Sequence, residues 1–239
     1  WAGQRDKLTA QFERAEDVLT EAAQLVSAPG PITAEAVDRA ILQRRERNDR
    51  VEDRMQDNIL RGTIMIAMDG EAIGQINGLT VRDMGDHAFG GPSRITARAS
   101  VGRRGVINIE RDVAMGGPIQ QKGAMVIQGF LAGRFARRHP LSFDVSITFE
   151  QNYGGVEGDS ASLAELLAIL SDLADAPIRQ GLAITGSVNQ RGDAQAIGGA
   201  HHKIEGFFRA CQEIGALTGD QGVVVPASNE ENLVLRDDV

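Results

Sequence analysis

The sequence contains a single cysteine, Cys211, among its 239 residues, so no disulfide bond can form within the chain. An apolar stretch precedes it, Phe207-Phe208-Arg209-Ala210, which favours a buried structural thiol over a catalytic one. An unpaired cysteine fits a reducing, cytoplasmic setting. No run approaches the roughly 18 apolar residues that a membrane-spanning helix needs. No basic start followed by an apolar run marks a signal peptide, and Trp1 in place of an initiating Met suggests a fragment.

Several motifs of nucleotide and metal chemistry are also missing. The chain has no G-x-x-x-x-G-K-S/T loop for nucleotide phosphates, no H-E-x-x-H and no C-x-x-C. His201 and His202 are adjacent, but neighbouring residues of a helix point in different directions, so we expect a surface pair rather than a zinc site. A Ser-His-Asp triad is an alternative that nothing in the sequence supports.

The charge balance argues against a general affinity for nucleic acid. The formal net charge is −8, whereas nucleic-acid binding needs a dense basic surface. One stretch is rich in arginine, and acidic residues interleave with it at helical spacings: Arg44, Arg45, Arg47, Arg50 and Arg54, with Glu46, Asp49, Glu52 and Asp53. We interpret it as a solvated, salt-bridged helix face, with a phosphate-binding patch as the alternative.

The first 58 residues have the pattern of a helical segment. Apolar residues recur at spacings of three and four and predict one buried stripe: Leu8, Phe12, Ala15, Leu19, Ala22 and Ala23. Pro29-Gly30-Pro31 breaks this helix, and Thr33 is a suitable cap for the next. The following helix buries the face that carries Ala36, Val37, Ala40 and Ile41.

From about Gly62 the pattern changes to short β-type runs separated by glycine. Two hairpins are predicted, one pairing residues 63–68 with 74–81 and one pairing 95–101 with 106–109. Further strands are expected at 143–149, 182–185 and 222–226, and helices at 124–138, from Ser160 onward and at 204–214. The sum is a mixed α+β domain behind a helical appendage.

Ser160 stands in the glycine-rich run Gly154-Gly155-Val156-Glu157-Gly158-Asp159-Ser160-Ala161-Ser162. A serine where a turn leads into a helix lies near free N–H groups and the positive end of the helix dipole. Those groups are suited to stabilise a developing oxyanion. Serine and aspartate also cap helices in many proteins, and for Ser162 capping is our interpretation.

Lys203 is the candidate base for such a serine. An exposed lysine has a pKa near 10.4 and is protonated, but burial against apolar groups can lower its pKa by several units. Ile204, Phe207 and Phe208 supply apolar surroundings. The alternative is an ordinary solvated lysine at a helix start.

Together, V-E-G-D-S-A-S at 156–162 and A-I-G-G-A-H-H-K at 196–203 resemble the paired signatures of the Lon peptidase family, above all its B-type and bacterial Lon-like branches. Forty-three residues separate Ser160 from Lys203, as expected for the family's serine and lysine, and Asp159 precedes the serine as in the B-type. Other runs agree in order: 74–79 resembles G-x-V-N-G-L, 117–123 resembles G-x-I-x-x-K-G, and 225–226 and 229–233 resemble the strand and loop near the domain's end. The resemblance covers about residues 59–239.

The resemblance implies an α+β fold, a Lon proteolytic domain (ribosomal protein S5 domain 2-like) preceded by a small all-helical segment. Residues 1–58 would be an AAA+ lid-like segment and connector, and residues 59–239 a Lon-type proteolytic domain whose C-terminus continues past Val239. An ATPase domain would lie upstream. No cofactor is expected in this part, while ATP and Mg²⁺ would serve the ATPase domain.

The implied activity is that of an ATP-dependent-type serine endopeptidase in cytoplasmic protein quality control. Ser160 would be the nucleophile and Lys203 its base, with Thr185, Glu157 and Asp159 in supporting positions. Unfolded or damaged proteins would be the substrates, and the family implies a homo-oligomer, a hexameric ring. Two alternatives stay open: a non-catalytic Lon-like assembly or binding module, and an AAA+ ATPase fragment.

Overall fold

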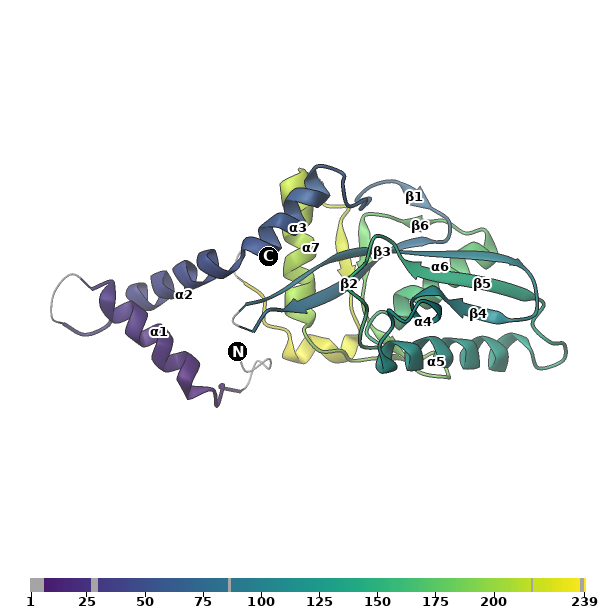
Figure 1. Cartoon of the computed structure of the whole chain (residues 1–239), viewed down its shortest axis with the longest axis horizontal. Helices are drawn as coiled ribbons and strands as arrows, with labels where there is room; N and C mark the ends of the chain where they lie inside the picture. Colours follow the sequence, from purple (N-terminus) through teal and green to yellow (C-terminus); the bar gives the residue numbers. More distant parts are fainter. Residues whose placement is uncertain (1–6, 27–29, 86, 216, 237–238) are drawn as a thin grey trace.

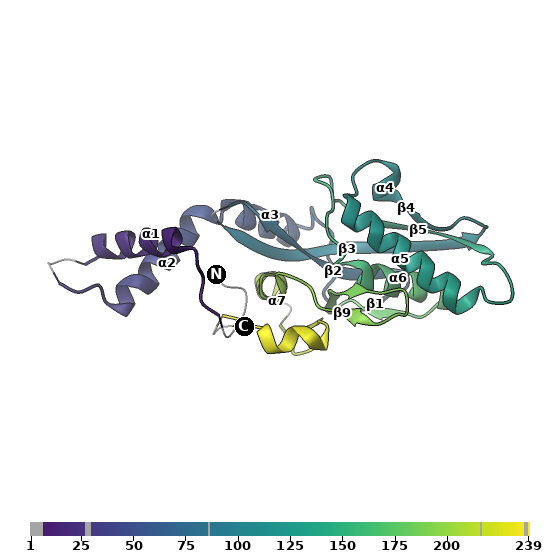
Figure 2. The same ribbon diagram turned by 90° about the horizontal axis from the view of Figure 1, so that it is seen from below.

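The computed structural model of the chain describes residues 7–26, 30–85, 87–215, 217–236 and 239. A six-stranded mixed sheet carries helices on both faces, and a helical arm extends from one end of it (Figures 1 and 2). The helices are α1 (Phe12–Gln24), α2 (Ala34–Asn48), α3 (Arg50–Leu60), α4 (Ile109–Asp112), α5 (Pro118–Phe135), α6 (Ser162–Ala174) and α7 (Ala200–Ile214), with a 3-10 helix η1 (Ala227–Asn232). The strands are β1 (Glu71–Ala72), β2 (Gln75–Asp83), β3 (Ala88–Val101), β4 (Gly105–Asn108), β5 (Phe143–Phe149), β6 (Ile178–Arg179), β7 (Leu182–Ile184), β8 (Ser187–Val188), β9 (Ala194–Gln195) and β10 (Gly222–Val224). This architecture confirms the predicted α+β class behind a helical segment.

The arm consists of α1 and α2, which pack through the small side chains Val18, Ala22, Ala36 and Ala40. The predicted stripe on α1 is wrong over most of its length. Its large members point outward: Leu8 is 97% exposed, Phe12 79% and Leu19 47%. Small residues at the contact let the two helix axes approach closely, so the buried face is the one with Val18 and Ala22.

Ion pairs also join the two helices of the arm. Arg44 pairs with Asp17 at 3.2 Å and with Glu21, and Arg47 pairs with Glu21 as well. The arginine-rich stretch therefore forms the expected salt-bridged surface, but its partners lie mainly on α1 rather than within the stretch. Thr33 caps α2 as predicted, its hydroxyl accepting from Ala36 N. Pro29, the first residue of the predicted break between the two helices, lies outside the described residues.

The sheet has the strand order β10-β7-β2-β3-β5-β4, and both predicted hairpins need correction. Residues 63–68 form no strand, because side chains satisfy their backbone groups: Gln151 contacts Met65 N and Thr63 O, and Asn77 Nδ2 donates to Ala67 O. Strands β3 and β4 do not pair, because β5 lies between them, antiparallel to β3 and parallel to β4.

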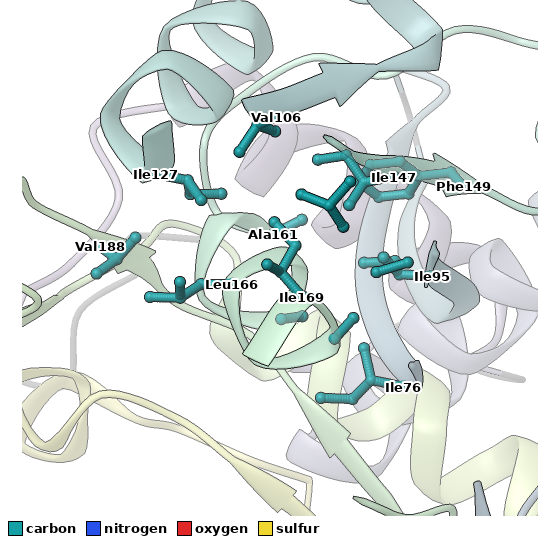
Figure 3. Packing of buried hydrophobic residues seen from close by; sticks show 14 of the residues in the cluster. Ile76, Ile95, Val106, Ile127, Ile147, Phe149, Ala161, Leu166, Ile169 and Val188 are labelled. Carbon is teal, nitrogen blue, oxygen red and sulfur yellow. The ribbon is translucent and has the colours of Figure 1, made fainter. Parts of the chain in front are cut away.

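Two apolar clusters lie on opposite faces of the sheet. The larger cluster joins α5 and α6 to the strands through residues such as Ile127, Ile169 and Ile147 (Figure 3). The smaller joins α3 and α7 through Met55, Ile59, Phe207 and Cys211. Ile184 of β7 belongs to the first and its neighbour Ala183 to the second, as alternation along a strand requires. The domain boundary predicted between residues 58 and 59 falls within α3.

The predicted burial of Cys211 is confirmed, since this thiol is 1% exposed in the smaller cluster. Burial also raises the pKa of Cys211 to about 11, which keeps the group as an unreactive thiol. None of the described helices combines the length and apolar character needed to cross a membrane.

Helix α7 touches strand β3 backbone to backbone. A Cβ atom placed on Gly206 would lie 2.0 Å from Gly90 O, and one placed on Gly90 would lie 2.2 Å from His202 O. Only glycine at both positions permits this approach. The contact presses the first turn of α7, which carries Lys203, against the sheet.

We therefore expect Gly206→Ala to lower the free energy of unfolding by about 1–3 kcal/mol, because the added methyl group must displace backbone rather than a flexible side chain. Chemical denaturation of the two proteins measures the difference. The control is Gly133→Ala near the end of α5, where no described atom outside the adjoining backbone of that helix lies within 4 Å of the added carbon. Alanine's better helix propensity makes that change neutral or slightly stabilising. Equal stability of Gly206→Ala and the parent would contradict the close contact.

Candidate active site

Residues 157–163, named the nucleophile segment after the candidate nucleophile Ser160, follow the loop after β5 and lead into α6. Gly158 has a φ of 87°, a left-handed conformation that turns the chain so that Asp159 and Ser160 lie next to the end of β7. Ser160 O accepts from Gly186 N at 2.8 Å, which ties the segment to that strand end. Ser160 precedes α6 and does not cap it. Ser162 is not a cap either: its hydroxyl accepts from Val188 N.

Lys203 reaches the same point from α7. The helix begins at Ala200, earlier than predicted, so Lys203 lies in its first turn. Its side chain is buried, with the residue 2% exposed. Lys203 Nζ lies 2.7 Å from Ser160 Oγ and 2.8 Å from Thr185 Oγ1. The structure thus brings together the serine and lysine that the sequence singled out.

The surroundings of Lys203 favour the uncharged amine. Burial lowers the pKa of Lys203 from 10.5 to about 8, and the nearby Asp159 carboxylate opposes that effect. Among the described residues, no carboxylate forms an ion pair with Nζ. A lysine with this pKa has an appreciable neutral fraction near physiological pH.

Thr185 serves both partners of the pair. Its hydroxyl donates to Ser160 O at 3.1 Å and lies 2.8 Å from Lys203 Nζ. The residue is fully buried, and it follows β7 directly. The Thr185 hydroxyl therefore fixes the position of the Ser160 backbone relative to Lys203 Nζ.

The two acidic residues predicted beside the site have different surroundings. Asp159 accepts a hydrogen bond from Ser187 Oγ at 2.9 Å. Glu157 accepts from Ile119 N at 3.2 Å, so its carboxylate caps the N-terminus of α5. The structure does not bring Glu157 into hydrogen-bond contact with Ser160 or Lys203. Its charge balances the helix dipole instead.

A second buried group with a shifted pKa is Glu165 on α6. Burial raises the pKa of Glu165 to about 7, although Gln120 donates to it at 3.0 Å. The negative charge of nearby Glu110 raises the pKa of Glu165 further. Among the described residues, Glu110 Oε2 has no hydrogen-bond partner. This group titrates in the same range as Lys203 and must be separated from it in any pH profile.

A cleft of about 710 Å³ opens onto Ser160 and Lys203. One wall is apolar and is supplied by α3, the segment after it and β2: Met55, Ile59, Ile64, Ile66 and Leu79. The glycine-rich run that leads to Ser160 also lines the cleft. Residues 79–83 of β2 border it as well, past the last pairing of β2 with β7 at Gly78.

The sequence missed Ser187 and Gly186 as parts of this site. The predicted strand ended at Thr185, yet the chain continues beside the nucleophile segment through both residues. The one local signal is the polar Ser187 two residues beyond Thr185, and an isolated serine after a strand is not a distinctive pattern.

The described residues contain no group of three His, Cys, Asp or Glu side chains placed to hold a metal ion. The rings of His201 and His202 pack at 4.0 Å. Both are half-buried rather than fully on the surface, and burial lowers the pKa of His202 to about 4. His202 borders a separate cavity between the arm and α7, away from Ser160.

Comparison with known proteins identifies two families along the chain. Residues 142–236 match the family described as "Lon protease (S16) C-terminal proteolytic domain", and residues 1–47 match "Archaeal LonB, AAA+ ATPase LID domain". A "Putative Lon protease homolog" of Escherichia coli (strain K12) is 48% identical over 202 residues, covering 83% of this chain and 34% of that protein. An "Archaeal Lon protease" of Halobacterium salinarum is 28% identical over 99% of this chain and 32% of its own length.

The chain thus spans about a third of the length of the curated relatives it matches. Its N-terminal helices correspond to the lid family and its C-terminal half to the proteolytic family. The motifs around Ser160 and Lys203 and these matches lead to one conclusion: the chain belongs to the Lon protease family.

Proposed function

We propose that this chain is the proteolytic part of a Lon-type serine endopeptidase that hydrolyses peptide bonds with a Ser160–Lys203 dyad. The observation that carries the proposal is the 2.7 Å contact between Ser160 Oγ and the buried Lys203 Nζ. A hydroxyl is a weak nucleophile unless a base takes its proton, and a lysine acts as that base only when it is neutral.

Acylation begins with Ser160 donating its hydroxyl proton to the neutral amine of Lys203 while Oγ attacks the scissile carbonyl carbon. The new C–O bond converts the carbonyl to a tetrahedral oxyanion. Collapse breaks the C–N bond, and the Lys203 ammonium returns its proton to the leaving amine. The products of this half-reaction are an ester on Ser160 and a neutral Lys203.

Deacylation repeats the steps with water as the nucleophile. Lys203 takes a proton from the water as it attacks the ester carbonyl, and the ammonium then protonates Ser160 Oγ as the C–O bond breaks. The 2.8 Å contact with Thr185 Oγ1 keeps Lys203 Nζ within reach of the attacking water and of Ser160 Oγ. Because Thr185 also binds Ser160 O, the dyad keeps its geometry between the two half-reactions.

Backbone N–H groups around Ser160 would receive the oxyanion. Within the described chain, neither Ser160 N nor Ala161 N donates to a protein acceptor, and both lie at the N-terminal end of α6. Free donors at the positive end of a helix dipole stabilise developing negative charge. We expect the substrate to lie extended along residues 79–83 of β2, whose backbone borders the cleft.

The remaining functional expectations concern the whole protein. The match of residues 1–47 to an AAA+ ATPase lid supports a role beside an ATPase domain. The use of ATP and Mg²⁺ by that domain, a ring of identical subunits and unfolded proteins as substrates stay expectations from the family resemblance. This chain would supply the hydrolytic chemistry of such an assembly.

Labelling with a fluorophosphonate tests the proposal. We expect the probe to modify Ser160, at a rate that rises with pH through about 8, because the neutral form of Lys203 is required. At pH 7 about one tenth of the lysine is neutral, and above pH 9 most of it is. Peptide mapping identifies the modified residue, and labelling over a pH series gives the midpoint.

Two variants make the result specific. Ser160→Ala should lose the label. Glu165→Gln should keep both the label and the midpoint, which separates the titration of Lys203 from that of the buried carboxyl group with a pKa of about 7. A folded chain that takes up no label would support the non-catalytic alternative, and a rate independent of pH would remove Lys203 from the mechanism.

A further inference from the structure

The chain that leaves β7 runs beside the nucleophile segment, and three hydrogen bonds join the two. Gly186 N donates to Ser160 O at 2.8 Å, Leu163 N donates to Gly186 O at 3.0 Å, and Val188 N donates to Ser162 Oγ at 3.0 Å. These bonds fix the path of residues 186–188 relative to Ser160. A side chain on this path therefore has a fixed position relative to the dyad.

Ser187 is the polar side chain at the centre of that path, and it is 5% exposed. Its hydroxyl lies 2.9 Å from Asp159 Oδ2 and 3.5 Å from Gln195 Oε1. A hydroxyl has one proton to donate, and a bond to a charged acceptor is shorter and stronger than one to an amide. The hydrogen bond to Asp159 is therefore the one that Ser187 makes.

Asp159 immediately precedes the nucleophile and acts on its base. The carboxylate stabilises the ammonium form of Lys203, yet the two groups form no ion pair among the described contacts. A direct ion pair would keep Lys203 protonated and would remove the lone pair that accepts the Ser160 proton. The distance of the Asp159 carboxylate from Lys203 therefore decides whether the amine can lose its proton.

Other charged residues lie near Asp159 and Lys203, but none of them makes the hydrogen bond that Ser187 makes to Asp159. Asp159, Lys122 of α5 and Arg191 line a second cavity of about 540 Å³. On the cleft side, Glu157 is engaged with Ile119 N. The remaining charged residues that line the cleft are Arg82, Asp83, Arg94 and Glu150.

We propose that Ser187 is a positioning residue whose hydroxyl holds the Asp159 carboxylate out of contact with Lys203 and so keeps the dyad free of a competing ion pair. The inference rests on the proposed Ser160–Lys203 chemistry. Among the described residues, the Ser187 hydroxyl makes no hydrogen bond to Ser160 or Lys203, and in this proposal it acts only through Asp159.

The test is the pH dependence of kcat/KM for a fluorogenic peptide, measured on the full chain and on Ser187→Ala. Once released, the carboxylate turns toward Lys203 and moves the midpoint of the rise upward by about one pH unit. Activity at pH 7 then falls about tenfold, and at high pH it approaches that of the parent. A purely structural role would lower activity equally at every pH.

The same change in an Asp159→Asn background is the control for mechanism. With no carboxylate to release, Ser187→Ala should leave the midpoint of Asp159→Asn unchanged. If Ser187→Ala does not fold, as judged by thermal melting, the nearly isosteric Ser187→Cys supplies a weaker donor and should give a smaller shift in the same direction.

An unchanged or lowered midpoint in a folded Ser187 variant would overturn the inference while leaving the dyad in place. A parent chain that neither labels at Ser160 nor cleaves the peptide would overturn the proposed function, and the positioning role with it. A shift of equal size in the Asp159→Asn background would show that Ser187 acts by another route and would also reject the inference.

Discussion

Ser160→Ala is expected to reduce peptide hydrolysis to background, a loss of roughly 10⁶-fold in kcat. The change removes the atom that forms the acyl-enzyme, so no partial activity through the same route remains. The fold should persist, because the segment is held through Ser160 O by Thr185 and Gly186, and these bonds do not involve the side chain. Cleavage of a fluorogenic peptide and chemical denaturation measure the two effects.

Ser162→Ala is the matched control for this loss. Ser162 lies two residues further on, is 1% exposed and accepts from Val188 N. Its removal leaves a buried N–H without a partner, which costs about 1–3 kcal/mol of stability. We expect Ser162→Ala to be less stable yet to keep most of its turnover. Full turnover by Ser160→Ala, or equal inactivation by both changes, would contradict the assignment of the nucleophile.

Lys203→Met is expected to lose function and gain stability together. Removing the base should lower kcat by roughly 10³-fold or more, because proton transfer from Ser160 then lacks an acceptor. At pH 7 the wild-type lysine is charged in the unfolded chain, but burial disfavours that charge in the folded one. Replacing it with an apolar side chain of similar length should raise the free energy of unfolding by about 1–3 kcal/mol.

The size of this stability effect depends on pH. The folded-state pKa of Lys203 is about 8, below its ordinary value of 10.5, so burial of this lysine costs stability in full at pH values below about 8. The cost declines as pH rises from about 8 to 10.5, since the unfolded chain then loses the same proton. The advantage of Lys203→Met should shrink over that interval. Denaturation curves at pH 7 and pH 10 measure it.

The variant Lys203→Arg separates the loss of activity from the gain in stability. Arginine stays protonated, so it cannot act as the base, and it carries a charge into the same buried position. We expect this variant to be inactive without the gain in stability. An active Lys203→Met variant, or one that is less stable than the parent at pH 7, would contradict a buried neutral amine in this position.

The prediction of the Ser160–Lys203 pair rests on the resemblance of two short motifs, taken together, to the paired signatures of the Lon family, because each motif alone also fits an ordinary helix start. Glycines before Ser160 and before Lys203 mark the two turns, and Thr185 follows a recognisable strand. The structure brings these three side chains into contact. Ser187 was missed because its importance depends on Asp159, which is 28 residues away, and no local pattern joins the two.

The errors concern long-range pairing. Periodicity identified apolar residues on α1 but not the neighbour that would cover them, so Phe12 was predicted buried and is exposed. The strand-like run at 63–68 has suitable residues, yet Gln151 and Asn77 satisfy its backbone groups from elsewhere in the fold. Strands β3 and β4 are adjacent in sequence, but β5 separates them. Strand order arises from contacts that a local pattern does not encode.

Ser160, Lys203 and Thr185 belong to one chain, and the contacts among them are made within that chain. If the proposed dyad acts in an assembly of identical subunits, we expect each copy to carry its own set of these three side chains. A copy with an altered Ser160 would then remove only its own set, and mixed assemblies would lose hydrolysis in proportion to the altered copies.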